Sequence, residues 1–436
     1  MITPSKQPLR LCLLLSILLA ASARAQTLQL IPDHSSGYYQ AGEPVRWQVV
    51  AEGPVSNEVG YVIKSGGLTE IARGQARLTA GKGEIESRQA EPGTLLVEAT
   101  ATSKTGETVR ALSGAVFSGD KIQPAAPRPA DFDGFWQAKL DELAAVPTNA
   151  VLTPLPCGKS DVDYWQISMD TIRGARIRGQ LARPKQGERL PALLVLQWSG
   201  VYPLQTQWVV DRAAAGWLAL NISAHDLPID QPNAFYSAQS AGALKEYSHI
   251  GRDDREKCYF LRMYLSCYRA ADYLAHRPDW DGKTLVVTGG SQGGMQALVA
   301  AAFHPHVTAA LADVPAGCDL LCTKAGRAPS WPMWFYGTNS IATNAVLETG
   351  RYYDVVNFAS RITCPILVGV GLLDDVCPPS SVFAACNQVA GPKEIVLLPN
   401  AGHRDVNHSH AVFHARFDAW LDALRRGQPP PVRAEE

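Results

Sequence analysis

A serine lies among four glycines in the stretch TLVVTGGSQGGMQALVAAA, which runs from Thr284 to Ala302. The apolar run before Ser291 has the character of a buried strand, and the alanine-rich segment after it has that of a helix. Small residues at such a junction permit a sharp turn that exposes the serine hydroxyl at the carboxyl end of a sheet. A phosphate-binding loop is the alternative, but neither the lysine of a P-loop nor the three-glycine dinucleotide spacing is present. The pattern therefore favours Ser291 as a nucleophile.

A serine hydroxyl is a weak nucleophile near neutral pH, so it needs a base and a group that orients the base. In folds with this turn, these partners follow in the chain order serine, acid, histidine. The strand-like run PILVGVGLL delivers Asp374 and Asp375 at its end, and EIVLLPNAG delivers His403. Taken singly, an aspartate that caps a turn and a surface histidine would be the ordinary interpretation. Their order, spacing and strand-end positions instead predict that one of these two aspartates is the acid and that His403 is the base.

Three further histidines, His408, His410 and His414, follow closely. They lack a cysteine or carboxylate at the spacing that would complete a metal site. We expect them on the exposed and packed faces of the last helix, and we expect the chemistry to need no metal and no organic cofactor.

These groups must be positioned by the elements around them, and residues 131–426 contain six strand-like apolar runs separated by mostly helical patterns. The runs are ALLVLQW, WLALNIS, TLVVTG, VTAALADV, PILVGVGLL and EIVLLP. Each is continuously apolar, as strands buried on both faces are. The order predicts an α/β domain with a mainly parallel sheet covered by helices on both sides.

The chain before this domain has a different hydrophobic pattern. Residues 26–120 contain short alternating runs such as PVRWQVV, which predict a small β-sandwich of immunoglobulin-like type. It carries no cluster of chemical groups, so a structural cap is favoured over a spacer or a carbohydrate-binding role. The proline-rich residues 121–130 are expected to be a linker, and residues 427–436 a disordered tail.

The first 25 residues have the features of a cleaved export signal. Lys6 and Arg10 precede an apolar run from Leu11 to Ala23 that is short for a membrane anchor, and a small-x-small motif follows. We expect a soluble protein that is secreted or periplasmic. Eight cysteines lie beyond this segment, and their spacing does not determine whether any pair forms a disulfide. We expect Cys267 to be a buried thiol on a helix.

The composition limits the partners. The chain has 40 Lys and Arg against 41 Asp and Glu, without a basic run. Nucleic acids and anionic membranes are therefore unexpected partners, and a small or neutral polymeric molecule is favoured.

Several motifs together resemble the family of acetyl xylan esterases and cephalosporin C deacetylases, carbohydrate esterase family 7, within the α/β-hydrolases. They are PADFDGFW, GGSQGG, GLLDDVCPPSSVFAACN and the loop of His403. The resemblance spans about 129–424, and the Asp-x-x-Cys-Pro-Pro element is its most specific part. It implies an α/β-hydrolase fold with Ser291 as nucleophile, Asp374 rather than Asp375 as acid, and His403 as base.

The chain departs from this family at two turns. Where the family has His-Gly-Tyr after an early strand, this chain reads WSGVYPL, with Gly200 retained and Val201 in place of the tyrosine. Where the family has Arg-Gly-Gln after the next strand, this chain reads NISAHD. We expect the backbone N–H groups of Gln292 and Val201 to form the oxyanion hole, and Tyr202 to take over part of the tyrosine's role in substrate binding.

The sequence thus predicts a secreted serine carboxylesterase that deacetylates xylan-like carbohydrates, in a chain that could form a homo-oligomer. Trp331 and Trp334 are expected to line the substrate pocket, although ordinary packing explains them equally well. A serine peptidase of the prolyl oligopeptidase type is the alternative enzyme, but 90 residues are too few for its propeller. An inactive carbohydrate-binding protein is the other alternative, and the presence of all three chemical groups disfavours it.

Overall fold

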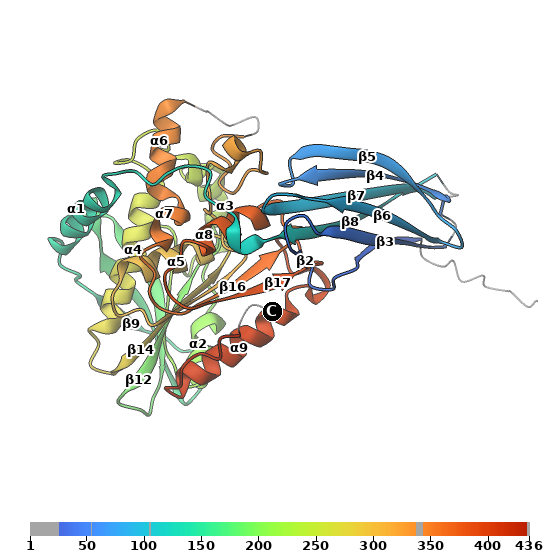
Figure 1. The fold of residues 1–436 in the computed structure, drawn as a ribbon. Helices are drawn as coiled ribbons and strands as arrows, with labels where there is room; N and C mark the ends of the chain where they lie inside the picture. The colour runs from blue at the N-terminus through green and yellow to red at the C-terminus, as the bar shows by residue number, and fades with distance from the viewer. Residues whose placement is uncertain (1–25, 54, 104–105, 337–342, 434–436) are drawn as a thin grey trace, which may run out of the picture.

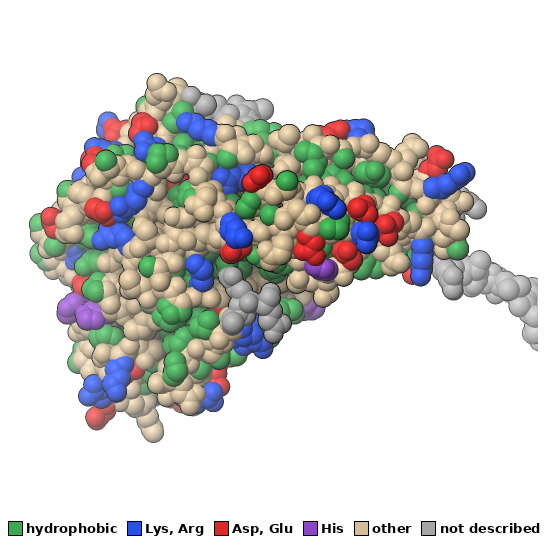
Figure 2. Space-filling model, viewed as in Figure 1, with side chains coloured by type: hydrophobic (Ala, Val, Ile, Leu, Met, Phe, Trp, Pro, Cys, Tyr) green, Lys and Arg blue, Asp and Glu red, His purple; other side chains and the backbone are tan. Residues whose placement is uncertain are grey.

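The computed structural model describes residues 26–53, 55–103, 106–336 and 343–433, and the predicted export signal lies outside them. The described chain forms a β-rich region that projects from a larger α/β body (Figure 1). Charged side chains of both signs are interspersed on the face shown in Figure 2. Among the described residues, every helix is too short or too polar to span a lipid bilayer.

The β-rich region consists of two facing sheets. The sheets have the orders β1-β3-β6 and β2-β8-β7-β4-β5. Their strands are β1 (Thr27–Pro32), β2 (Tyr38–Tyr39), β3 (Pro44–Glu52), β4 (Glu58–Ser65), β5 (Thr69–Arg77), β6 (Lys82–Arg88), β7 (Gly93–Thr102) and β8 (Thr108–Phe117). In β3, Val45, Trp47 and Val49 are buried while the residues between them are exposed. This alternation gives each sheet an inner apolar face, which confirms the predicted sandwich.

The α/β body is built on one sheet of nine strands in the order β17-β16-β15-β14-β12-β13-β11-β10-β9. Pairing is parallel from β13 to β17 and antiparallel from β13 through β11 and β10 to β9. The strands are β9 (Val151–Pro154), β10 (Val162–Asp170), β11 (Arg176–Pro184), β12 (Leu190–Leu196), β13 (Leu218–Ile222), β14 (Trp280–Gly290), β15 (Ala309–Asp313), β16 (Ile366–Gly371) and β17 (Lys393–Leu398). All six predicted runs are strands, as the mainly parallel α/β prediction requires.

Helices cover both faces of this sheet. Along β14, Leu285 and Val287 belong to one buried cluster and Val286 to the other, because successive side chains point to opposite faces. Helices α2 (Gln207–Ala214) and α9 (Ala411–Arg425) pack on the face of Val286. The opposite face carries α1 (Phe132–Ala144), α4 (Tyr259–Ala275), α5 (Gln292–Phe303), α6 (Asn344–Tyr353), α7 (Val355–Ala359) and α8 (Pro379–Cys386). Helix α3 (Asn233–Ala241) lies in the segment that connects β13 with α4.

The β-rich region contacts the α/β body at the loop that follows β16. A Cβ atom on Gly114 would lie 2.5 Å from the carbonyl oxygen of Leu372, and one on Gly37 would lie 2.6 Å from that leucine's side chain. The amide of Asn387, just after α8, donates to the carbonyl oxygens of Gly119 and Ile122 at 2.8 and 2.9 Å. The two parts of the chain therefore meet beside the segment that carries Asp374.

The predicted linker and the predicted tail both contact the α/β body. The predicted linker, 121–130, is packed onto the body: Ile122 is buried, and the backbone N–H of Ala125 donates to Asp319 at 2.8 Å. Of the predicted tail, 427–436, the structure describes residues up to 433. The N–H of Arg433 donates to Glu394 at 3.1 Å, and Arg416 donates to the carbonyl of Pro431. Both contacts involve the buried Arg416–Glu394 ion pair.

None of the eight cysteines among the described residues forms a disulfide bond. Cys267 is fully buried on α4, as predicted.

Candidate active site

Ser291 occupies a strained turn between β14 and α5. Its φ and ψ angles are 54° and −121°, a combination that most residues avoid. A Cβ atom on Gly289 would lie 2.4 Å from the carbonyl carbon of Gly293, and one on Gly293 would lie 2.4 Å from the carbonyl oxygen of Leu196. The flanking glycines are thus required by the close approach of three backbone segments, as the sequence predicted.

The structure brings Ser291, His403 and Asp374 into one hydrogen-bonded chain. Nε2 of His403 lies 2.8 Å from Ser291 Oγ, and Nδ1 lies 2.9 Å from Asp374 Oδ2. The Asp374 side chain is fully buried, and its Oδ1 accepts the N–H groups of Val376 and Cys377 at 2.8 and 2.7 Å. Because Asp374 accepts the Nδ1 proton, Nε2 is left free to accept the serine proton.

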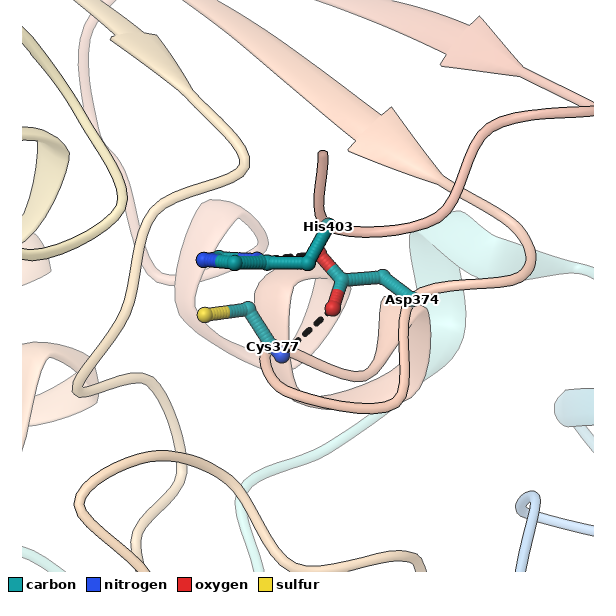
Figure 3. Close-up of side chains that lie close together, drawn as sticks. All are labelled: Asp374, Cys377 and His403. Atoms are coloured by element: carbon teal, nitrogen blue, oxygen red, sulfur yellow. Dashed lines mark hydrogen bonds and ion pairs between the residues drawn. The ribbon is translucent and has the colours of Figure 1, made fainter. Parts of the chain in front are cut away.

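Asp374, Cys377 and His403 lie side by side in the close-up view (Figure 3). One ligand atom from each lies within 4.8 Å of the others, a set of donors that could hold a metal ion. Both carboxylate oxygens of Asp374, however, already accept hydrogen bonds. Burial raises the pKa of the Cys377 thiol well above its ordinary value, with a further contribution from the Asp374 charge. A protonated thiol is a poor ligand, so these residues fit a hydrogen-bonded set better than a metal site.

The competing acidic and histidine residues lie elsewhere. Asp375 is exposed, and His408 lies in a short 3-10 helix after the His403 loop. His410 is buried: its Nδ1 lies 2.9 Å from Asp313 Oδ2, and its Nε2 lies 3.1 Å from the carbonyl oxygen of Gly402. The hydrogen bond to Asp313 raises the pKa of His410. Sequence reasoning gave His410 no role, yet its contact with Gly402 supports the loop that carries His403.

The turn after β12 carries the other predicted site residues. Gly200 has a φ angle of +118°, and Tyr202 stacks on Trp198 with ring centroids 5.4 Å apart. The Tyr202 hydroxyl donates to the carbonyl of Trp198 at 3.0 Å, which closes the turn on itself. Val201 packs on the apolar core at the middle of the turn. Gln292 begins α5, so its backbone N–H has no acceptor within the helix.

The two predicted pocket tryptophans differ in exposure. Trp334 is 1% exposed, stacks on Phe260 and donates its indole N–H to the carbonyl of Ser248 at 2.7 Å. Its role in this structure is packing, the alternative that the sequence left open. Trp331 is half-buried, and its backbone N–H donates to the carbonyl of Val376 at 2.9 Å. It therefore lies next to the loop that holds Asp374.

Comparison with known proteins supplies the family. The family model described as acetyl xylan esterase (AXE1) matches residues 120–421. The chain belongs to the acetyl xylan esterase family. Accordingly, it is a carboxylic ester hydrolase with an α/β-hydrolase fold, and the family supports a carbohydrate esterase function.

Individual relatives agree with this family. The chain is 32% identical over 392 residues to the acetyl esterase Axe7A of Xylanibacter ruminicola, a match that covers 87% of this chain and 88% of the relative. That share exceeds the part from residue 120 onward, so the similarity includes some of the β-rich region. The acetyl xylan esterase of Paenibacillus sp. R4 aligns with a TM-score of 0.58 and 27% identity over 69% of this chain and 98% of its own. Acetyl xylan esterase 1 of Thermoanaerobacterium sp. JW/SL YS485 aligns with a TM-score of 0.58 and 25% identity over 68% and 96%.

In this esterase, a groove of about 760 Å³ runs between α2 and α9 and reaches the glycines before the nucleophile. Trp198, Trp208, Phe413 and Phe417 contribute aromatic surface, and the backbone of Gly290 contributes part of the wall. Trp198 is 45% exposed and contacts Trp208 edge-on at 4.9 Å between ring centroids. Sequence reasoning missed Trp198 and Trp208. The only signal in the sequence was the position of Trp198 directly before the Gly200 turn.

Proposed function

We propose that this esterase is a secreted serine esterase that removes acetyl groups from acetylated carbohydrates such as xylan or xylo-oligosaccharides. The observation that carries the proposal is the chain of hydrogen bonds from Ser291 through His403 to Asp374, at 2.8 and 2.9 Å. This arrangement fits a nucleophile, a general base and the group that orients the base.

In the first half of the reaction, Ser291 Oγ attacks the acetyl carbonyl carbon while His403 Nε2 takes the serine proton. The carbonyl oxygen becomes an oxyanion, which the backbone N–H groups of Gln292 and Val201 stabilise. Asp374 holds the imidazole through Nδ1 and stabilises the imidazolium. The tetrahedral intermediate then collapses: the bond to the sugar oxygen breaks, and His403 returns its proton to that oxygen.

The second half hydrolyses the acetyl group on Ser291. His403 takes a proton from water as the water oxygen attacks the acetyl carbon, and the same two N–H groups receive the new oxyanion. Collapse of this intermediate breaks the bond to Ser291 Oγ, which regains its proton from His403. Acetic acid leaves and ionises to acetate in solution, and the enzyme returns to its starting state.

The choice of substrate rests on the family and on the groove. The similar proteins are named acetyl xylan esterases and an acetyl esterase, which supports acetyl as the acyl group. A glycan is a flat-faced, polyhydroxylated polymer that packs well on aromatic rings, and the groove presents Trp198 and Trp208 beside the nucleophile turn. We place the sugar chain there, with Tyr202, which contacts both Trp198 and Trp208, at its border.

Export rests on the first 25 residues, whose charge and apolar pattern are those of a signal peptide. A prolyl oligopeptidase-like activity is disfavoured because the β-rich region forms two packed sheets rather than a propeller.

The test is acetate release from acetylated xylan, mannan and pectin fragments, measured side by side, together with hydrolysis of p-nitrophenyl acetate, butyrate and octanoate. We expect acetate from xylan fragments, and a specificity constant that falls with acyl length because a closed pocket rejects extra methylenes. Activity confined to another glycan would contradict the xylan assignment, and a preference for octanoate would contradict deacetylation itself. Cleavage of peptidyl amides would favour the peptidase instead.

A further inference from the structure

Both backbone polar groups of Gly200 are held by buried side chains from distant segments. The Gly200 N–H donates to the Tyr247 hydroxyl at 3.2 Å, and the Gly200 carbonyl oxygen lies 2.9 Å from Nε2 of His225. His225 and Tyr247 are 1% and 7% exposed. A glycine turn at the edge of a sheet is thus fastened at two points.

The contact to the carbonyl also determines the direction of the next N–H group. The carbonyl of Gly200 and the N–H of Val201 belong to one planar trans peptide, in which they point in opposite directions. When His225 holds the oxygen, the rotation of this peptide is fixed. The Val201 N–H, the proposed oxyanion donor, is therefore aimed by a side chain that does not touch the substrate.

His225 is itself held in one tautomer. Arg262 donates to the Tyr259 hydroxyl at 2.9 Å, and this hydroxyl lies 2.7 Å from Nδ1 of His225. The Gly200 oxygen can only accept, so Nε2 carries the proton and Nδ1 accepts from Tyr259. Burial lowers the pKa of His225 to about 4, so the ring is neutral at ordinary pH. A directed chain of hydrogen bonds thus ends on the Gly200 carbonyl.

Tyr247 extends the network to the second proposed donor. Its hydroxyl donates to Oε1 of Gln292 at 2.5 Å while it accepts the Gly200 N–H. Gln292 is the first residue of α5 and is fully buried. One hydroxyl therefore connects the turn of Val201 with the residue whose N–H completes the predicted oxyanion hole.

We propose that His225 and Tyr247 are positioning residues that set the oxyanion hole of this esterase. This inference rests on the proposed function. His225 comes from NISAHD, the segment in which the chain departs from the pattern of the family that it resembles. The two side chains act through Gly200 and Gln292 and contact no reacting atom.

The experiment measures kcat and KM for p-nitrophenyl acetate in Tyr247→Phe, His225→Ala and His225→Gln. We expect kcat to fall about 10- to 100-fold in the first two variants, somewhat less than the loss of a whole donor, while KM stays within about twofold. His225→Gln should recover part of the loss, because its amide nitrogen can donate to the same carbonyl. Tyr247→Phe keeps the ring packing and removes only the hydroxyl, so it separates positioning from folding.

A transition-state analogue gives a readout that a packing defect would not move. Methylboronic acid forms a tetrahedral adduct with an active serine, so its inhibition constant should rise in parallel with the fall in kcat. His304→Ala is the matched control, because His304 is also buried but lies just beyond the far end of α5. This control should lower the melting temperature without changing either readout.

The outcomes are distinguishable. If Tyr247→Phe and His225→Ala keep kcat within about threefold while Ser291→Ala is inactive, the positioning role is wrong and the proposed function stands. A loss that His225→Gln does not recover, with unchanged binding of the boronic acid, also overturns the positioning role. If the wild-type protein releases no acetate from any ester, the proposed function fails and the inference fails with it.

Discussion

Two turns at the carboxyl edge of the central sheet are held in different ways. The turn of Ser291 is fixed by backbone atoms, because side chains on Gly289 or Gly293 would lie 2.4 Å from neighbouring main chain. The turn of Gly200 is fixed by side chains, those of His225 and Tyr247. A Cβ on Gly200 would meet only the Tyr202 ring, at 3.2 Å. One turn is therefore set by steric exclusion, and the other by hydrogen bonds from distant segments.

This difference predicts different responses to mutation. At the Ser291 turn there is no space for a side chain on Gly289 or Gly293, so a larger residue there should abolish the turn's geometry. A hydrogen-bonded turn loses accuracy when one partner is removed and keeps its overall path.

Single replacement of Ser291, His403 or Asp374 by Ala should each lower kcat by about 10³-fold or more, because the three groups act as one unit. Asp375→Ala and His408→Ala are the matched controls and should change kcat little, since neither side chain belongs to the hydrogen-bonded chain. Steady-state hydrolysis of p-nitrophenyl acetate measures both. An inactive His408→Ala beside an active His403→Ala would reverse the assignment of the base.

The buried His225 should lower the free energy of unfolding as the pH falls below neutral. Burial lowers the folded-state pKa of His225 to about 4, below the unfolded value of about 6.5. Between these values the unfolded state binds more protons, so the free energy of unfolding falls as the pH drops through this window, by up to about 3 kcal/mol. Denaturant unfolding at pH 7 and at pH 4 measures the loss. His225→Gln lacks this titration and should lose about that much less; equal losses in both proteins would refute the assignment.

Gly293→Ala should lower the free energy of unfolding by about 2 kcal/mol and abolish most activity, because the added carbon meets the carbonyl oxygen of Leu196 at 2.4 Å. The control is Gly134→Ala in α1, where an added Cβ meets nothing within 4 Å. That change should stabilise the helix by about 0.5–1 kcal/mol. Chemical denaturation gives both values. A Gly293→Ala protein with normal stability and turnover would show that the turn yields, contrary to steric exclusion.

Trp198→Ala and Trp208→Ala should raise KM for acetylated xylan about 5- to 10-fold, the equivalent of roughly 1 kcal/mol for a lost aromatic contact. KM for p-nitrophenyl acetate should not change, because this substrate has no glycan to occupy the groove. Trp165→Ala on β10 is the control, a half-buried tryptophan on the antiparallel side of the sheet. Equal losses on polymer and small ester would place the glycan elsewhere.

The sequence predicted what local rules control. Continuous apolar runs identified the buried strands. Glycine spacing together with chain order pointed to Ser291, His403 and one of two adjacent aspartates, and the family resemblance favoured Asp374. It did not reveal Tyr247 or His410, whose partners Gln292 and Asp313 lie 45 and 97 residues away. A tyrosine or histidine of this kind carries no local signal, because its role exists only after the sheet has formed. Trp334 shows the converse. Its aromatic side chain suited a binding site, but the fold buries it in the core.

The contact between Gly114 and Leu372 limits which domains could replace the β-rich region in an engineered chimaera. The main chain of β8 approaches the segment just before Asp374 so closely that a side chain at Gly114 would meet the leucine carbonyl at 2.5 Å. The β-rich region is therefore no interchangeable accessory. A replacement domain would also need residues without side chains where Gly37 and Gly114 contact Leu372. Deletion of the β-rich region would remove these contacts from the loop that carries Asp374.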